Sequence, residues 1–494
     1  MTVTNRRRTH RSNAGDDRNN AGVSTRKVAG RIIAVAAAAG LMMSATAPTA
    51  GAAAAQPFPG AEPCLTSSPA QPVCIGGTLP DGTAYQFAVP RNWNRVVLVD
   101  LDFAARGLDA PLTARLLEMG FARGGTTRLV TGWNIRQAID NQARALAIFK
   151  AAFGPVRWAI ASGNSMGGFV SAGVAQVHPD KFDATVAFCG GLGGAVGQWN
   201  QKLDTVFTLK ELLFPTAGLP VINIPPDVPG AQQAWINALA GAQATAEGRA
   251  RIGLAAAIGQ LPAWGVAPGG EPTPRPDRHD TTALQEGMYL ALAGGPLPYI
   301  GQAMSSRRQI EQLSGGNPSW NTGVDYARQF HTARPEHRRA VRELYRQAGL
   351  DLRADLARLN ATPRISADPS AVDYLTRGIV FTGRLRIPVL TINNIGDQIS
   401  TVAQQHAYGA IVRAGGNARL LRQTYVESVG HCAFTPAEQT AAILTMIQRL
   451  RTGHWPSTSP RAMNARVAAL DPASEGRYVT YRPERFNRPF YGHR

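Results

Sequence analysis

Apolar segments of strand length alternate with segments of helical periodicity between residues 95 and 188. The uninterrupted apolar run RVVLVDLDF (95–103) is typical of a strand that a sheet buries on both faces. Shorter apolar runs follow at 157–161 and 182–188, and a predicted helix precedes each of them. Alternation at this spacing predicts an α/β fold with a mostly parallel sheet flanked by helices.

The alternation stops for about 190 residues and then resumes. The segment 190–380 is mostly helical in its pattern and is interrupted by Pro and Gly. Beyond it, strands are predicted at 386–394 and 420–427 and helices at 401–416 and 435–453. The last helix has a clear start, because Thr435 is a candidate N-cap and Glu438 closes a capping box. The sequence therefore predicts one sheet interrupted by a large helical insertion.

The N-terminus has the composition of a targeting segment. Residues 1–31 contain eight Lys/Arg and two Asp, and an Ala-rich apolar run of about sixteen residues follows. Small residues then lead to a plausible cleavage site after Ala55, as in a secretory signal peptide. The run is shorter than the roughly 20 residues of a membrane-spanning helix. We therefore predict a secreted, extracellular protein without a stable membrane anchor.

Net charge is weak evidence for a partner. The chain carries a formal +18, of which +12 remains without residues 1–55. The basic residues of the whole chain are 46 Arg and 5 Lys, and this bias towards Arg also fits a GC-rich coding sequence. Nothing in the sequence matches a nucleic-acid-binding motif, so nucleic acid is not an expected partner. The basic charge leaves room for weak association with an anionic cell-wall polymer.

Four cysteines follow the predicted signal peptide. An even number in an exported chain favours two disulfides. Cys64 and Cys74 are near enough in sequence to pair, which leaves Cys189 and Cys432 for each other.

The turn ASGNSMGGF lies between a predicted strand and a predicted helix. Within it, residues 163–167 match G-x-S-x-G, the pattern of a nucleophile elbow. The central Ser165 would have to sit in a strained, sharp turn that leaves no room for bulky neighbours. The Met166 N–H would then point towards a developing oxyanion at the helix N-terminus. The alternative is an ordinary Gly-rich strand–helix turn.

A nucleophilic serine needs a base and an acid that orients the base. Asp397 follows the strand predicted at 386–394, at the edge where α/β sheets place their sites. His431 follows one helix and one strand later, in the loop before the capped helix. Glu427 is the nearest rival for the acid, but it precedes the end of the last strand.

These motifs, in this order, resemble the α/β-hydrolase superfamily over roughly 75–190 and 385–452. The resemblance implies that Ser165 is the nucleophile, His431 the general base and acid, and Asp397 the orienting carboxylate. It implies Met166 as one oxyanion donor, with Leu101 or Asp102 as the second. Members of the superfamily often have His-Gly at that second position, whereas this chain has Leu-Asp.

The dipeptide His431-Cys432 could also indicate a metal site or a cysteine nucleophile. A zinc site would need further ligands at suitable spacing, and neither C-x-x-C nor H-E-x-x-H is present, so no metal is expected. A cysteine nucleophile would need an elbow of its own. A Cys189–Cys432 disulfide would instead tether the histidine loop to the sheet. The tannase and feruloyl-esterase group is similar, but it pairs the equivalent cysteine with one just before the serine, where this chain has Asn164.

The expected organisation combines these segments. We predict a signal peptide (1–55), a first hydrolase part (56–189), a helical cap insertion (190–380), a second hydrolase part (381–455) and a basic aromatic tail (456–494). The expected activity is that of a serine hydrolase that cleaves a small-molecule or polymeric carboxylic ester through an acyl-enzyme, without a cofactor. The alternatives are a secreted serine aminopeptidase and a non-catalytic cell-wall-binding protein that keeps the fold.

Overall fold

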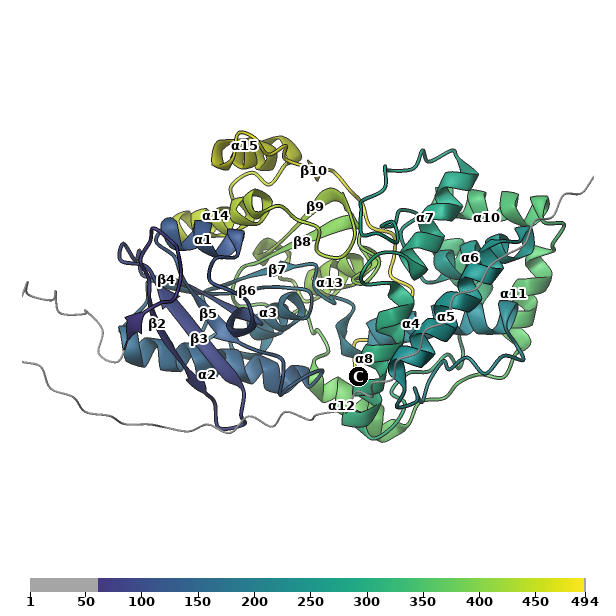
Figure 1. Cartoon of the computed structure of the whole chain (residues 1–494), viewed down its shortest axis with the longest axis horizontal. Coiled ribbons are helices and arrows are strands. Elements are labelled where there is room, and N and C mark those ends of the chain that lie inside the picture. Colours follow the sequence, from purple (N-terminus) through teal and green to yellow (C-terminus); the bar gives the residue numbers. More distant parts are fainter. Residues whose placement is uncertain (1–60, 493–494) are drawn as a thin grey trace, which may run out of the picture. The chain divides into compact units, whose positions relative to one another are not determined.

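A single twisted sheet forms the centre of the chain outside the predicted insertion of residues 190–380. The structure, a computed structural model that describes residues 61–492, has ten strands within that range, in the order β1-β2-β3-β5-β4-β6-β7-β8-β9-β10 (Figure 1). Their bounds are β1 Glu62–Pro63, β2 Val73–Thr78, β3 Ala84–Val89, β4 Val96–Leu101, β5 Ala122–Thr126, β6 Trp158–Asn164, β7 Ala184–Phe188, β8 Val389–Gly396, β9 Leu421–Val429 and β10 Tyr478–Val479. The six strands from β5 to β9 in this order are parallel, so their carboxyl ends meet at one edge.

Helices cover both faces of this sheet, as predicted. On one face α2 (Ile135–Phe153), α3 (Met166–Val177) and α13 (Ala403–Ala414) pack into one apolar cluster. On the other, α1 (Pro111–Glu118) and α14 (Pro436–Thr452) form a second cluster. The Thr435 hydroxyl accepts from the Glu438 N–H, and the Glu438 carboxylate accepts from the Thr435 N–H. These two hydrogen bonds confirm the predicted capping box.

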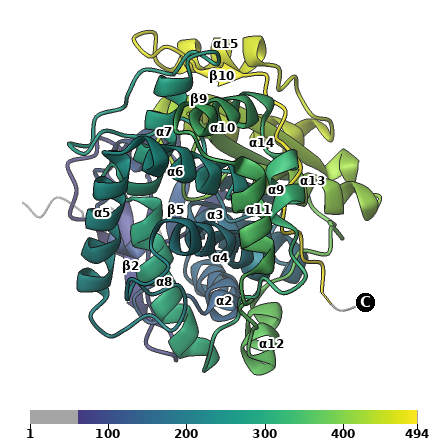
Figure 2. The same cartoon turned by 90° about the vertical axis from the view of Figure 1, so that its right-hand side faces the viewer.

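Nine helices lie between β7 and β8 in the described chain, and most of them pack into two hydrophobic clusters separate from those of the sheet. Figure 2 shows most of them facing the viewer. Their bounds are α4 Gly194–Leu213, α5 Val228–Gln243, α6 Ala246–Ile258, α7 Thr281–Ala293, α8 Tyr299–Ser314, α9 Tyr326–Thr332, α10 Pro335–Gln347, α11 Leu352–Ala361 and α12 Pro369–Gly378. We call this segment the helical insertion.

The predicted signal peptide (1–55) lies outside the described residues. Among residues 61–492, none of the helices has both the length and the apolar composition of a membrane span.

The C-terminal segment joins the sheet to the helical insertion. After α15 (Pro460–Leu470), β10 pairs antiparallel with β9. The chain then reaches the insertion, where Glu484 forms an ion pair with Arg334 at 3.1 Å. Further on, Arg488 Nη1 lies 2.9 Å from both carboxylate oxygens of Asp204 on α4. The basic aromatic tail therefore contacts both the sheet and the helical insertion, and we call it the C-terminal strap.

Replacement of Arg488 by methionine is expected to destabilise the protein by about 3–5 kcal/mol, because it leaves a buried carboxylate without its counter-ion. Asp204 is 1% and Arg488 9% exposed, and burial already raises the pKa of Asp204. The measurement is urea-induced unfolding. The control is Arg346→Met, which removes an exposed i,i+3 pair with Glu343 and should leave the unfolding midpoint unchanged. Equal effects of the two substitutions would contradict this assignment.

Candidate active site

Ser165 stands in a strained turn between β6 and α3. Its backbone has φ 60° and ψ −119°, a conformation that ordinary side chains avoid. The close approach of the turn to β4 explains the glycines on either side of it. A Cβ at Gly163 would lie 2.4 Å from Asp100 Oδ1, and one at Gly167 would lie 3.1 Å from the same atom. The pattern G-x-S-x-G is thus required by packing under the serine as well as by the turn itself.

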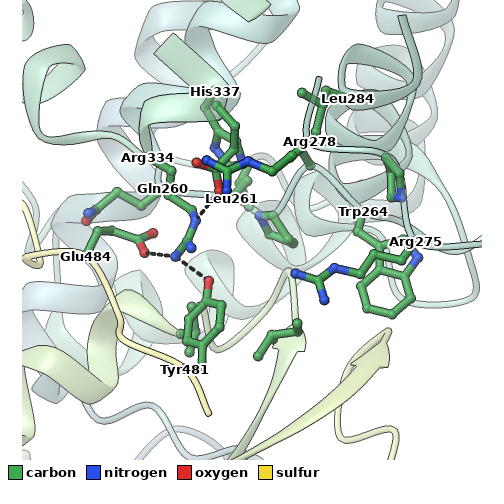
Figure 3. A pocket seen from close by; sticks show the side chains of 16 residues that line it. Gln260, Leu261, Trp264, Arg275, Arg278, Leu284, Arg334, His337, Tyr481 and Glu484 are labelled. Atoms are coloured by element: carbon green, nitrogen blue, oxygen red, sulfur yellow. Dashed lines mark hydrogen bonds and ion pairs between the residues drawn. The ribbon is translucent and has the colours of Figure 1, made fainter. Parts of the chain in front are cut away.

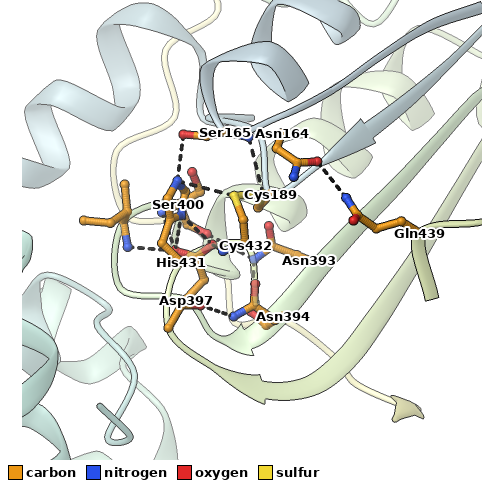
Figure 4. Close-up of a disulfide and its surroundings, with 12 residues drawn as sticks. Asn164, Ser165, Cys189, Asn393, Asn394, Asp397, Ser400, His431, Cys432 and Gln439 are labelled. Atoms are coloured by element: carbon orange, nitrogen blue, oxygen red, sulfur yellow. Dashed lines mark hydrogen bonds and ion pairs between the residues drawn. A yellow bond between two sulfur atoms is a disulfide. The ribbon is translucent and has the colours of Figure 1, made fainter. Parts of the chain in front are cut away.

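Ser165, His431 and Asp397 lie in one hydrogen-bonded line (Figure 4). His431 Nε2 is 2.7 Å from Ser165 Oγ. His431 Nδ1 is 3.0 Å from each of the two carboxylate oxygens of Asp397. The structure therefore brings together three side chains that are separated by as many as 266 positions in the sequence.

The Asp397 carboxylate is fully buried and held by backbone donors. Its Oδ1 accepts from the Ile399 N–H at 2.8 Å and from the Ser400 N–H at 2.9 Å. These bonds fix the orientation of the carboxylate, so that Oδ2 remains for His431 and, at 3.5 Å, the Cys432 N–H. Glu427, the rival acid, instead binds Arg275 at 2.8 Å.

Two disulfides are present, Cys64–Cys74 and Cys189–Cys432. The second joins the residue after β7 to the residue after His431. Its Cys189 sulfur also accepts a hydrogen bond from the Ser165 N–H at 3.4 Å. The disulfide therefore ties the loop of the histidine to the end of β7, and the hydrogen bond from Ser165 connects that cystine with the turn of the serine.

The edge of the sheet beside Ser165 contains the residues predicted as the second oxyanion donor. Leu101 ends β4, and Asp102 follows with φ 72°. The Asp102 carboxylate accepts from the Arg128 N–H at 3.1 Å and from Arg128 Nε at 2.7 Å. The negative charge near the proposed oxyanion position is therefore balanced by a guanidinium. Met166 is the first residue of α3, where backbone N–H groups have no partner within the helix.

A second buried carboxylate lies beneath the serine turn. Asp100 on β4 contacts Arg106 at 2.9 Å and Arg123 at 3.5 Å. Burial raises the pKa of Asp100 to about 6, although both guanidinium groups act to lower it. Because its Oδ1 packs against Gly163 and Gly167, this carboxylate supports the serine turn from the side of β4.

Helix α4 of the insertion contacts the loop of Asp397, which the sequence did not indicate. Gln201 Nε2 donates to Thr401 Oγ1 at 2.9 Å, and Lys202 Nζ donates to the Ile399 carbonyl at 3.3 Å. Lys202 is 2% exposed. The only sequence signal is that no carboxylate occurs three or four positions away from this lysine, where a surface helix would place an ion-pair partner.

A cavity of about 80 Å³ lies on another side of the Asp397 loop (Figure 3). Ile395 and Val402, which flank that loop, form part of its wall, but Ser165 and His431 do not. His337 lines the cavity, and burial lowers the pKa of this imidazole to about 4. Arg334 there binds Glu484 and Tyr481, so the C-terminal strap forms one wall of the cavity.

Within residues 61–492, one group of potential metal ligands has its ligand atoms within 4.8 Å of one another: Cys189, Asp397 and Cys432. Its two sulfurs are joined in a disulfide, so they are not thiolate ligands. The third member is the carboxylate bound to His431.

The parallel strand order, the serine turn after β6 and the inserted helices define the chain as a hydrolase of the α/β-hydrolase superfamily. No protein-family model matches the sequence. The chain is 36% identical over 435 residues to the o-phthalyl amidase of Xanthobacter agilis, covering 82% of this chain and 93% of that enzyme, and it belongs to the same family.

Solved structures give more distant matches. Feruloyl esterase B from Aspergillus oryzae is 15% identical, with 78% of this chain and 82% of that one covered and a TM-score of 0.38. An acylaminoacyl peptidase from Pyrococcus horikoshii is 8% identical, with 77% and 41% covered and a TM-score of 0.34.

Proposed function

We propose that the protein is a serine hydrolase that cleaves a carboxylic ester through an acyl-enzyme, with Ser165 as nucleophile, His431 as general base and acid, and Asp397 as orienting carboxylate. The observation that carries the proposal is the contact of 2.7 Å between His431 Nε2 and Ser165 Oγ, together with the pairing of His431 Nδ1 and Asp397. This arrangement places a base on the hydroxyl and a carboxylate on the base.

In the first step, Ser165 Oγ attacks the ester carbonyl carbon while its proton moves to His431 Nε2. The carbonyl oxygen becomes an oxyanion, which we assign to the N–H of Met166 and the N–H of Leu101 or Asp102. When the tetrahedral intermediate collapses, the C–O bond to the leaving group breaks and the alkoxide takes the proton from His431. The acyl group remains on Ser165.

In the second step, water attacks the acyl carbon and gives a proton to His431. Collapse breaks the bond to Ser165 Oγ, which takes the proton back, and the carboxylic acid leaves. Asp397 keeps its negative charge throughout and stabilises the imidazolium that forms in both steps. Its two backbone bonds from Ile399 and Ser400 hold it in the orientation that this requires.

Amide hydrolysis is the second candidate activity. The relative with 36% identity is named for cleavage of an o-phthalyl amide, and the same acyl-enzyme steps apply when the leaving group is an amine. The amine of an amide is a poorer leaving group than the alcohol of an ester, and it must be protonated as it leaves. His431, which contacts Ser165 Oγ, can donate that proton. A peptide substrate of the aminopeptidase type belongs to this same reaction class.

We also propose export from the cytoplasm. Two disulfides are typical of an oxidising compartment. The basic, Ala-rich segment 1–55 has the composition of a signal peptide. Edman sequencing of the mature protein is expected to start after Ala55.

The test of the proposed chemistry is labelling of the purified protein by a fluorophosphonate probe, followed by peptide mapping. The expected result is stoichiometric modification of Ser165 in the wild type and none in Ser165→Ala. Ser162→Ala, in the buried strand just before the turn, is the matched control and should label normally. A folded wild type that does not label would overturn the serine mechanism.

The substrate class is decided by comparing para-nitrophenyl esters with para-nitroanilides of the same acids. We expect higher kcat/KM for the esters. Anilide turnover above ester turnover would instead assign the amidase activity.

A further inference from the structure

The amino ends of the parallel strands form the edge of the sheet opposite the proposed catalytic side chains. Ser165 and Asp397 directly follow the carboxyl ends of β6 and β8, and the helical insertion begins beyond the carboxyl end of β7. Because β6 has seven residues, about 23 Å separate the two edges along this strand. Basic residues precede five neighbouring strands at the amino edge, in the sheet order β4-β6-β7-β8-β9: Arg95, Arg157, Lys181, Arg384 with Arg386, and Arg419. We call these six residues the cationic row.

The cationic row is nearly level across the sheet. The Arg157 N–H donates to the Arg95 carbonyl at 2.6 Å, so these two residues lie side by side. When the strand pairings are continued back towards the amino edge, Lys181 is level with Arg157. Arg386 and Arg419 lie within two positions of the same level. Neighbouring strands are about 4.8 Å apart, so the edge presents one or two cations at each interval of about 5 Å.

The residues of the cationic row have no charged partner. All six are exposed, and within residues 61–492 none of them forms an ion pair with a carboxylate within 4.0 Å. Acidic residues near these strand starts are fewer, namely Glu118 at the end of α1 and Asp180 and Asp183 beside Lys181. The Asp183 carboxylate already accepts from the Ala159 N–H at 2.8 Å. The amino edge therefore carries an excess of positive charge.

The helix dipole does not explain the cationic row. Arg413 and Arg451 lie in the last turns of α13 and α14, where a cation stabilises the partial negative charge of a helix end. The six residues of the row instead precede strands, and a sheet has only a small net dipole. A solvated charged face remains the simplest alternative, but such a face does not require cations at one level on five successive strands.

Tryptophan rings hold two of the guanidinium groups in the row. Arg95 lies 5.0 Å from the centroid of the Trp93 ring, and Arg157 lies 4.3 Å from that of Trp158. A guanidinium that stacks on a ring still presents N–H donors in its own plane, in a fork that matches the two oxygens of a carboxylate. The stacked arginines are therefore oriented to bind anions at the edge.

Two further arginines extend the row past β9. Arg422 and Arg449 lie over the same ring, that of Trp455, at 5.4 Å and 5.7 Å from its centroid. Burial and, to a smaller extent, the charge of Arg449 lower the pKa of Arg422. In the described structure, Arg449 Nε is buried and has no hydrogen-bond partner. An anion bound to both guanidinium groups would relieve their mutual repulsion and supply the missing acceptor.

The chemistry of this edge distinguishes among polyanions. Membrane-surface binding usually inserts apolar side chains, and the strongly exposed large apolar residues of the described chain lie in other segments. Single-stranded nucleic acid stacks its bases on aromatic rings, but Trp93 and Trp158 are half-buried and carry Arg95 and Arg157 on their faces. One charge for each strand, at intervals of about 5 Å, is close to the length of one sugar unit in a linear polysaccharide.

We propose that the cationic row is a docking surface for a linear acidic polysaccharide with one carboxylate on each sugar unit. Successive carboxylates of the polymer would bind the guanidinium and ammonium groups of successive strands, from Arg95 at β4 to Arg419 at β9. The inference is independent of the proposed function, because the polymer binds at the edge opposite Ser165. Docking would hold the protein on a polymer while the edge with Ser165 stays open to substrate.

The experiment measures binding of the wild type to immobilised polygalacturonate by surface plasmon resonance. Ionic strengths of about 0.01 M and about 0.15 M are compared, at which charges are screened over about 30 Å and about 8 Å. We expect saturable binding at the lower ionic strength, weaker binding at the higher one, and none to the neutral polymer dextran. Absence of binding to polygalacturonate at the lower ionic strength would overturn the proposal.

The row variant is Arg157→Gln/Arg386→Gln/Arg419→Gln. We expect its affinity for polygalacturonate to fall by about tenfold to a hundredfold, because three cations that each contribute a modest attraction are lost. Its kcat for a para-nitrophenyl ester and its unfolding midpoint in urea should match those of the wild type. Unchanged affinity in this folded variant would contradict the docking surface.

The matched control is Arg328→Gln/Arg353→Gln/Arg358→Gln, which lowers the net charge by the same amount. These three arginines are also exposed, but they lie on α9 and α11 of the helical insertion. This variant should bind polygalacturonate with nearly the wild-type affinity. Equal weakening in the two triple variants would show that net charge alone causes binding, and the assignment of this edge would then be wrong.

A comparison on the wild type alone covers the case in which the row variant does not fold. Polygalacturonate should bind more tightly than poly-deoxythymidine with the same number of charges, and more tightly than vesicles of phosphatidylglycerol. Tighter binding to the DNA would assign the edge to a phosphodiester polymer, and tighter binding to the vesicles would assign it to a membrane surface. Either result would overturn the polysaccharide assignment.

Discussion

Replacement of Asp397 by asparagine is expected to lower kcat by about 10⁴-fold without unfolding the protein. The two backbone N–H groups of Ile399 and Ser400 require an acceptor at the position of Oδ1, so the asparagine oxygen must occupy it. The asparagine NH₂ then takes the place of Oδ2 and donates to His431 Nδ1. The imidazole must carry its own proton on Nε2, where it faces Ser165 and cannot act as a base. The measurement is steady-state hydrolysis of a para-nitrophenyl ester.

The chain offers a matched control for this substitution. Asp140 and His178 form a second aspartate–histidine pair, with 2.8 Å between Asp140 Oδ1 and His178 Nε2. Asp140 lies on α2, and His178 lies at the C-terminal end of α3, opposite the end that follows Ser165. Asp140→Asn should leave kcat unchanged. If folded Asp397→Asn kept more than a tenth of the wild-type activity, Asp397 would not be the orienting acid.

Removal of the Cys189–Cys432 disulfide is expected to destabilise the protein by about 5 kcal/mol, whereas removal of Cys64–Cys74 costs about 3 kcal/mol. The difference arises because the two bonds restrict unfolded loops of 243 and 10 residues, and the entropy of closing a loop grows with its length. The paired variants Cys189→Ala/Cys432→Ala and Cys64→Ala/Cys74→Ala are compared by urea-induced unfolding.

Removal of the two disulfides is also expected to differ in its effect on activity. Only Cys432 is adjacent to His431, so only the first pair of substitutions should also lower kcat under conditions in which both variants are folded. An equal loss of activity, or none in either, would show that the bond does not fix the histidine loop.

Sequence patterns identified the sheet because its central strands are strongly apolar. The run at 95–103 became β4, and the turn that holds Ser165 lies at the end of β6 as expected. Helix α15, beyond the helix predicted as the last, was not predicted. Two strands were not predicted either, namely β1 and β10. Each has only two residues, and its pairing depends on a neighbouring strand rather than on its own periodicity. Strands of this length leave no detectable pattern in a sequence.

The candidate site likewise contains residues that the sequence could predict and residues that it could not. Ser165, Asp397 and His431 could be proposed from their order and from the strands that precede them. The pairing of Asp102 with Arg128 could not, because it joins the ends of two strands that become neighbours only in the folded sheet. Lys202 was missed for a related reason. A lysine within a helix normally faces solvent, and its burial here follows from the position of the helical insertion over the sheet.

The strap formed by the C-terminal segment also has a consequence for the order of assembly during synthesis. Synthesis proceeds from the N-terminus, so β10 cannot join β9, nor Arg488 reach Asp204, until residues 478–488 have left the ribosome. All strands from β2 to β9 are available before that moment, whereas α4 gains its counter-ion only afterwards. Docking of the C-terminal segment on the helical insertion is therefore expected to follow formation of the sheet, and a nascent chain that has not yet released residues 478–488 would have strands β2 to β9 but not the Arg488–Asp204 ion pair.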